Sequence, residues 1–288
     1  MKLIFDILKG MVIGLANIIP GVSGGTMMVS MGIYDTLIYC ITHLFKEFKK
    51  SVLTLLPYAV GMVVALVGLS FIITTALDKF ALPTNMLFIG LIFGGLPAIL
   101  SQIKGEKKGV PGILLFLLFA AFIILLEVIR TENTVHIQLS VLEVLKLFLM
   151  GVIASATMVI PGVSGSMMLM LFGYYHPVVD SVKGLTTALV SLDMGAILTN
   201  AGILLPFGIG IVVGIFAIAK MIEVLLAKWK GLTYCAILGL VAASPVAILM
   251  GLNYSGIGIG TVLVSVVTFA AGFAIAWALC KKDTEKQA

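Results

Sequence analysis

The sequence predicts an all-α polytopic membrane protein with an inverted-topology repeat, about six transmembrane helices and two re-entrant helical hairpins. Three observations carry this prediction. The composition is strongly apolar, a helix-breaking string occurs twice inside apolar stretches, and the basic residues are distributed unevenly among the loops.

The composition excludes an ordinary water-soluble domain. Of the 288 residues, 61% are hydrophobic and 11% are charged, whereas soluble domains carry about 25% charged residues. The net charge of +5 comes from lysines in short loops between apolar segments, a pattern of membrane orientation and not of nucleic-acid binding. The three cysteines are scattered, so we expect neither a disulfide framework nor a metal site, and no cofactor.

Eight apolar stretches follow one another along the chain. Six of them suit one crossing each, because a transmembrane helix needs about 20 residues. The other two are long for one crossing, short for two crossings with a turn, and interrupted by Pro-Gly. The eight stretches are 10–42, 52–77, 84–101, 111–129, 147–175, 197–226, 233–251 and 259–280, and the interrupted ones are 10–42 and 147–175.

The chain repeats itself once. Pro-Gly-Val-Ser-Gly at 20–24 occurs again at 161–165, which is 141 residues further on. Leu-Pro at 56–57 with Gly61 matches Leu-Pro at 205–206 with Gly210, which is 149 residues further on. We therefore divide the chain into two repeats, 1–135 and 136–288, each with one interrupted segment followed by three plain spans.

The basic residues indicate how the interrupted segments run. If both cross the membrane, 7 of the 18 basic residues lie outside. If each enters and returns to the same side, 4 of the 18 lie outside, and the positive-inside rule favours this arrangement. Both termini are then cytoplasmic. Each repeat contains three crossings, so the two repeats have opposite orientation, as in many secondary transporters.

The two interruptions predict an anion site. Pro20 and Pro161 stop an incoming helix, and the outgoing helix then begins near Ser23 and Ser164 with unpaired backbone N–H groups. Such groups survive in a bilayer only beside protein or a water-filled cavity. Helix N-termini and hydroxyls bind phosphate or carboxylate without Arg or Lys. The candidate binding residues are Asn17, Gly21, Ser23, Gly24, Gly25, Thr26, Gly162, Ser164, Gly165 and Ser166.

Two uses of these residues stay open. In an inverted repeat the hairpin tips meet near the bilayer midplane, where such transporters bind substrate. Alternatively, the small residues let helices pack closely and bind nothing. Asn17 would either bind the head group or cap the end of its helix. Tyr34, Tyr174 and Tyr175 close the hairpins, and we expect them near the interfaces, as in an aromatic belt.

The doubled motif also carries a family resemblance. IIPGVSGGTMM at 18–28, VIPGVSGSMM at 159–168, FGYY at 172–175 and the two-repeat layout resemble the bacterial polyprenyl-phosphate transporter family, formerly a membrane domain of unknown function. The resemblance implies a flippase, not an enzyme, that returns undecaprenyl phosphate across the cytoplasmic membrane for lipid-carrier recycling in cell-envelope synthesis. The implied partners are this anionic isoprenoid lipid, the bilayer, and a proton or a sodium ion for coupling.

Rival functions use the same motif differently. A secondary transporter of a small anion, or of another lipid phosphate, needs the same anion site. An intramembrane serine hydrolase needs a base within about 3 Å of its serine. The histidines His43, His136 and His176 all lie at segment ends, which disfavours a hydrolase. The Gly-Lys-Ser/Thr ending of a nucleotide-binding loop is absent.

Overall fold

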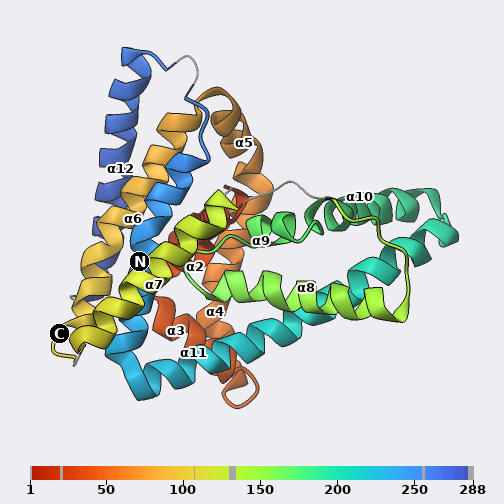
Figure 1. Ribbon diagram of the computed structural model, residues 1–288, viewed down its shortest axis with the longest axis horizontal. Helices are drawn as coiled ribbons and strands as arrows, with labels where there is room; N and C mark the ends of the chain where they lie inside the picture. The colour runs from red at the N-terminus through yellow and green to blue at the C-terminus, as the bar shows by residue number, and fades with distance from the viewer. Residues whose placement is uncertain (1, 20–21, 107, 130–133, 255–256, 285–288) are drawn as a thin grey trace.

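The computed structural model describes residues 2–19, 22–106, 108–129, 134–254 and 257–284. Within these residues all regular structure is helical (Figure 1). The elements are α1 (Lys2–Ile18), α2 (Gly24–Ser30), α3 (Tyr34–Thr42), α4 (Phe48–Val64), the π-helix η1 (Ala65–Leu69), α5 (Ser70–Lys79), α6 (Ala81–Ile103), α7 (Gly109–Val128), α8 (Val141–Val159), α9 (Gly165–Leu171), α10 (Tyr175–Ser191), α11 (Met194–Met250) and α12 (Ile259–Thr284).

Six of the described helices are long and apolar enough to cross a bilayer, which confirms the all-α polytopic class. They are Phe48–Leu69, Ala81–Ile103, Gly109–Val128, Val141–Val159, Met194–Met250 and Ile259–Cys280. Large apolar side chains face outward along them. Leu118 on α7 is 62% exposed and Val267 on α12 is 67% exposed. An outer surface of this kind is stable against lipid and not against water.

Each of the six expected spans overlaps one of these helices. The expected spans 197–226 and 233–251 are two helical segments within α11, which meet at Trp229, where the backbone is non-helical (φ −138°, ψ 51°). Helix α8, part of the expected hairpin 147–175, is 19 residues long and therefore also meets the length criterion. Length and hydropathy cannot distinguish a helix that crosses the bilayer from one that stops inside it.

Helices α1 and α4 pack closely and run in the same direction. The backbone of Tyr58 lies against Gly10, and that of Met62 lies against Gly14. The residue numbers of the contacting pairs increase along both helices, so the two helices run in parallel. A side chain at either glycine would collide with the backbone of α4. Because α1 and α4 are parallel, the chain must return to its starting end between Ile18 and Phe48.

Helices α8 and α11 repeat this contact. Gly151 packs on Phe207, and Ser155 packs on Gly214, again with both helices running in one direction. Gly151 and Ser155 lie 141 residues beyond Gly10 and Gly14. Phe207 and Gly214 lie 149 residues beyond Tyr58 and Ala65, and Ala65 also lies against Gly14. These are the two offsets of the sequence repeat. The contacts follow the offsets of the sequence repeat, and the division into 1–135 and 136–288 stays a prediction.

The chain doubles back after α8. The Tyr174 hydroxyl donates a 2.6 Å hydrogen bond to Glu143 Oε1, and the Val135 amide donates a 3.1 Å bond to the Gly173 carbonyl. The end of α9 therefore lies beside the start of α8. A re-entrant hairpin needs this geometry, and its place in the bilayer stays a prediction.

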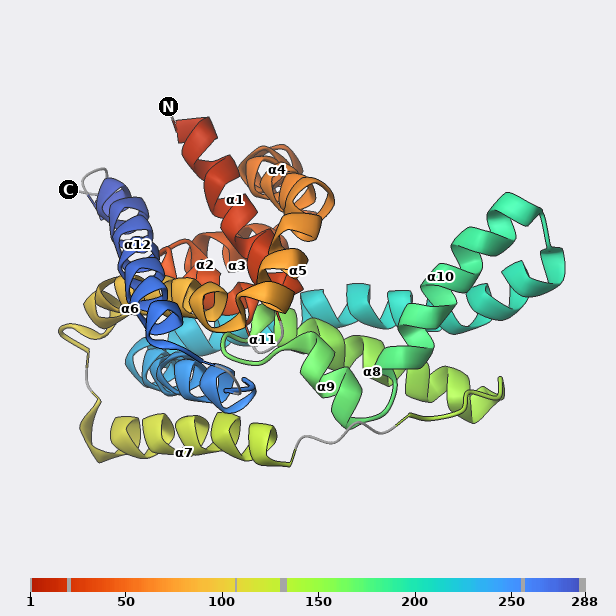
Figure 2. The ribbon, with the colours of Figure 1, turned by 90° about the horizontal axis from the view of Figure 1, so that it is seen from above.

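The last helix of each predicted repeat packs against a helix of the other repeat. Helix α6 packs on α12, with Gly90 against Phe269, and the two lie side by side in both ribbon views (Figures 1 and 2). Helix α7 packs on the second part of α11, with Gly239 against Phe116. The last plain span of each predicted repeat, α7 or α12, thus packs on the middle plain span of the other. In contrast, α8, α10 and the first part of α11 extend together to one side (Figure 2).

Candidate functional site

The first break separates α1 from α2. Helix α1 ends at Ile18, and Ser23 is the extended N-cap residue of α2 (φ −109°, ψ 135°). The Gly24 amide donates a 3.2 Å hydrogen bond to Asn17 Oδ1. The first amides of a helix have no acceptor within it. Asn17 supplies one across the break.

The second break separates α8 from α9. Helix α8 ends at Val159, and Gly162 has a φ of +86°, in the left-handed region that suits glycine. Ser164 is the extended N-cap residue of α9 (φ −92°, ψ 132°). The Ser164 and Ser166 hydroxyls share a 2.9 Å hydrogen bond. Both outgoing helices therefore begin where the sequence predicts.

The two breaks lie against each other. The Gly162 amide donates a 2.7 Å hydrogen bond to Thr26 Oγ1. The Ser23 hydroxyl donates a 3.3 Å hydrogen bond to the Thr157 carbonyl. Both contacts are buried and join residues more than one hundred positions apart in sequence. Each break thus supplies partners for polar groups of the other.

Two further contacts close the junction. A side chain on Gly25 would come within 3.2 Å of the Pro161 backbone, so α2 packs directly on the second break. The Tyr34 hydroxyl donates a 3.0 Å hydrogen bond to the Val159 carbonyl at the end of α8. The expected aromatic-belt position of Tyr34 is wrong, because this side chain is only 1% exposed. Tyr174, which is 5% exposed, is likewise buried. Both hydroxyls satisfy acceptors inside the protein.

A cavity of about 230 Å³ lies between the breaks and is lined by both. Five predicted site residues line it, and four of them carry hydroxyl or amide side chains. They are Asn17, Ser23, Ser164, Gly165 and Ser166. Val22, Met62, Leu66, Thr157, Met158 and Val163 complete the described lining. The residues that the structure describes contribute no lysine or arginine to the cavity wall.

The local electrostatics rest on hydrogen-bond donors. Helices α2 and α9 have only seven residues each, because the chain turns again at Gly32 (φ +69°) and Gly173 (φ +79°). So few aligned peptides produce a smaller dipole than the roughly half charge of a long helix. First-turn amides and hydroxyls, acting by direct hydrogen bonds, are the groups that remain for an anion.

The other predicted site residues lie around the cavity. Thr26, Gly25 and Gly162 hold the breaks together, as described above. Gly24 faces a neighbouring cavity beside α3 and α4. Gly21 lies outside the described residues.

Sequence reasoning missed six residues of the lining, among them Thr157, Met62 and Leu66. Thr157 is the last polar residue before the second break, and its polarity was an available signal. Met62 and Leu66 come from α4 and η1, far from either motif in sequence. A π-helix often marks a functional site. Only Gly68 within η1 hinted at an irregular helix there.

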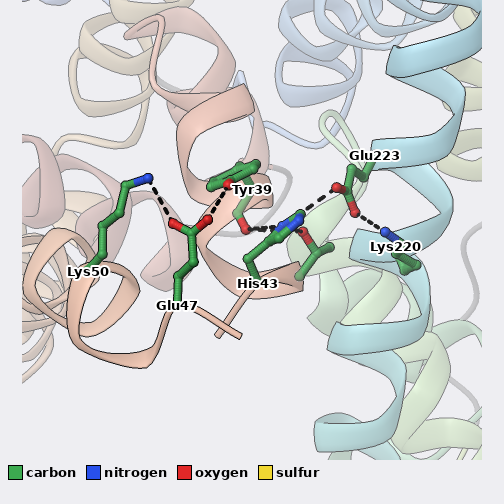
Figure 3. A network of polar contacts seen from close by, with 7 residues as sticks. Tyr39, His43, Glu47, Lys50, Lys220 and Glu223 are labelled. Atoms are coloured by element: carbon green, nitrogen blue, oxygen red, sulfur yellow. Dashed lines mark hydrogen bonds and ion pairs between the residues drawn. The ribbon is translucent and has the colours of Figure 1, made fainter. Parts of the chain in front are cut away.

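A charged network lies beyond the far end of α3, and Figure 3 shows its residues Tyr39, His43, Glu47, Lys50, Lys220 and Glu223. His43 Nδ1 lies 3.6 Å from Glu223 Oε1 on α11. Glu47 accepts hydrogen bonds from Lys50 and from the Tyr39 hydroxyl, both 2.8 Å long. The Lys50 bond, and then the Tyr39 bond, hold the pKa of Glu47 below its ordinary value. The network ties the segment after α3 to α11.

The network also bears on the hydrolase alternative. His43 makes its polar contacts there, and not at a break. Among the described residues, the hydroxyls of Ser23 and Ser164 bond to Thr157 and Ser166, and neither bonds to a histidine or a lysine. A serine nucleophile needs such a base.

These features define a class of protein: a multi-pass membrane protein with a small cavity between two interrupted helices, whose otherwise apolar wall carries hydroxyl and amide side chains. Secondary transporters use sites of this kind. The comparisons with known proteins agree. A family model described as VCA0040-like, undecaprenyl phosphate translocase-like, matches residues 13–257. The chain belongs to this family.

Two relatives support the assignment. A polyprenyl-phosphate transporter from Staphylococcus aureus is 32% identical over 98% of this chain and 98% of its own length. A polyprenyl-phosphate transporter from Vibrio cholerae is 31% identical over 81% of this chain and 73% of its own length. The comparisons thus place the chain among transporters and not among enzymes. No solved structure matches it significantly.

The contact between the breaks can be tested at Thr26. Replacing Thr26 by Val keeps the shape and removes the acceptor of the buried Gly162 amide. An unsatisfied buried donor costs about 1–3 kcal/mol, so Thr26→Val should lower the midpoint of thermal unfolding of the purified protein. Thr26→Ser keeps the hydroxyl and should retain most of the stability. Equal midpoints for Thr26→Val and the unchanged protein would show that the bond does not join the breaks.

Proposed function

We propose that this protein is a flippase for polyprenyl phosphate, undecaprenyl phosphate in particular, in the bacterial cytoplasmic membrane. It would move the lipid carrier across the bilayer for reuse in cell-envelope synthesis. The observation that carries the proposal is the polar cavity lined by both Pro-Gly breaks. The names of the two relatives supply the substrate.

The lining suits a phosphate monoester. Its oxygens accept hydrogen bonds, and Ser23, Ser164 and Ser166 carry hydroxyls that donate. Ser23 and the Ser164–Ser166 pair form hydrogen bonds inside the protein, which a head group would replace. A site without a fixed cation binds more weakly than an Arg or Lys clamp. Transport needs binding that is weak enough to allow release.

The arrangement of helices also suits transport. We propose that 1–135 and 136–288 are repeats of opposite orientation, with re-entrant hairpins at 10–42 and 147–175 and both termini cytoplasmic. The parallel pairs α1–α4 and α8–α11 support this, because each hairpin must return to its starting side. Rocking of one half against the other would expose the head group to each leaflet in turn, while most of the tail stays in lipid.

The head-group site can be tested by removing its hydroxyls. The combined variant Ser23→Ala, Ser164→Ala and Ser166→Ala should transfer undecaprenyl phosphate between the leaflets of proteoliposomes at least about tenfold more slowly, because hydrogen bonds to a charged group contribute about 1.5–3 kcal/mol each. A matched variant, Thr187→Ala with Ser191→Ala on the exposed part of α10, should transfer it normally. Normal transfer by the triple variant would exclude this site.

The orientation can be tested by labelling single cysteines in a variant without Cys40, Cys235 and Cys280. Lys46→Cys lies between α3 and α4, and Asp180→Cys lies on α10; both positions are exposed. A membrane-impermeant maleimide should label position 180 in intact cells and position 46 only after permeabilisation. If position 46 is labelled from outside, the first hairpin is not re-entrant.

A further inference from the structure

A second cavity opens directly beside the polar one. Its volume is about 290 Å³, and three residues, Asn17, Met62 and Met158, line both cavities. Its walls are otherwise almost wholly apolar and come from both predicted repeats: α1, α3 and α4 on one side, and α8 and α11 on the other. They include Ile13, Leu37, Ile41, Leu55, Val159 and Ile215.

We propose that this apolar cavity binds the first isoprene units of the lipid tail, next to the phosphate. The inference rests on the proposed function and specifies how the same site recognises its substrate. A head group between Ser23 and Ser164 is inside the protein, because these residues are only 3% and 6% exposed. The tail is covalently attached to the phosphate, so its first units must also lie inside the protein before the chain reaches lipid.

The adjoining cavity has the properties that this part of the tail requires. Contact between its apolar lining and hydrocarbon removes apolar surface from water, which is favourable. The same lining has few groups that could bind a hydrated ion. Met28, Met62 and Met158 contribute flexible side chains that adapt to a branched chain. Its volume is at the lower limit of the roughly 300–1,000 Å³ of ligand pockets. It therefore suits a single chain, and a phospholipid with two acyl chains would not fit.

Another apolar cavity is the main competitor for the tail. It has a volume of about 390 Å³ and lies between α7 and α11 beside Pro161, with Ala236 in its wall. It shares none of its described lining residues with the polar cavity. The shared residues therefore favour the cavity beside α3 and α4.

The test measures binding to the full-length protein in nanodiscs. The probes are inorganic phosphate, farnesyl monophosphate and phosphatidic acid, which separate the head group, one prenyl chain and two acyl chains. Farnesyl monophosphate should bind at least about tenfold more tightly than inorganic phosphate, because its first units bury apolar surface. Phosphatidic acid should bind no more tightly than inorganic phosphate.

Filling the cavity should remove this gain. Leu55→Trp places a large ring in the cavity from α4. It should weaken the binding of farnesyl monophosphate about tenfold, while the affinity for inorganic phosphate should stay within about twofold of its original value. Ile41→Trp fills the cavity from α3 and should do the same, which covers the case that one variant does not fold. The matched control is Leu56→Trp, a neighbouring leucine that is 51% exposed on the outer surface.

Three results would overturn the inference. The gain could survive in the folded tryptophan variants, it could be absent from the unchanged protein, or it could be lost instead on filling the competing cavity with Ala236→Trp. Failure of the head-group site gives a different result: Ser164→Ala would then leave the binding of inorganic phosphate unchanged. The two failures are therefore distinguishable.

Discussion

A polypeptide that interrupts its helix inside a bilayer must find hydrogen-bond partners for the exposed backbone within the protein. In this chain side chains from the first half supply such partners for the second interruption. Thr26 accepts from the Gly162 amide, Ser23 donates to the Thr157 carbonyl, and Tyr34 donates to the Val159 carbonyl. At the first interruption Asn17 accepts from the Gly24 amide. The contacts between the breaks hold α2 and the start of α3 against the end of α8.

The same contacts explain how a membrane protein can form an anion site without a buried cation. An isolated lysine or arginine at this depth would be costly. Hydroxyls and first-turn amides cost less, because they can bond to the protein when the site is empty, as Ser164 and Ser166 do. A head group would exchange these bonds for its own. Under our proposal, the phosphate would meet the hydroxyl and amide groups of one cavity, and the first part of the tail would meet the apolar cavity beside Asn17 and Met62.

Local signals in the sequence predicted much of this arrangement. Proline and glycine placed the ends of α1 and α8, and the serines that follow placed the N-caps of α2 and α9. The rest depends on tertiary packing. No local pattern distinguishes a buried Tyr34 from an interfacial one, or brings Met62 to the cavity. Gly32 and Gly173 mark where α2 and α9 end. A glycine alone does not show that a helix ends, and the positive φ values at these two positions are visible only in the structure.

The central claim is that the polar cavity between the two breaks receives the phosphate head group. Phosphorus–nitrogen dipolar recoupling in solid-state NMR measures this contact most directly, with undecaprenyl phosphate bound to protein labelled with ¹⁵N in glycine and serine. The account predicts transfer from the phosphorus to the amides of Gly165 and Ser166, and its loss when the cavity hydroxyls are removed. Bound lipid that shows no transfer to either amide would contradict the account.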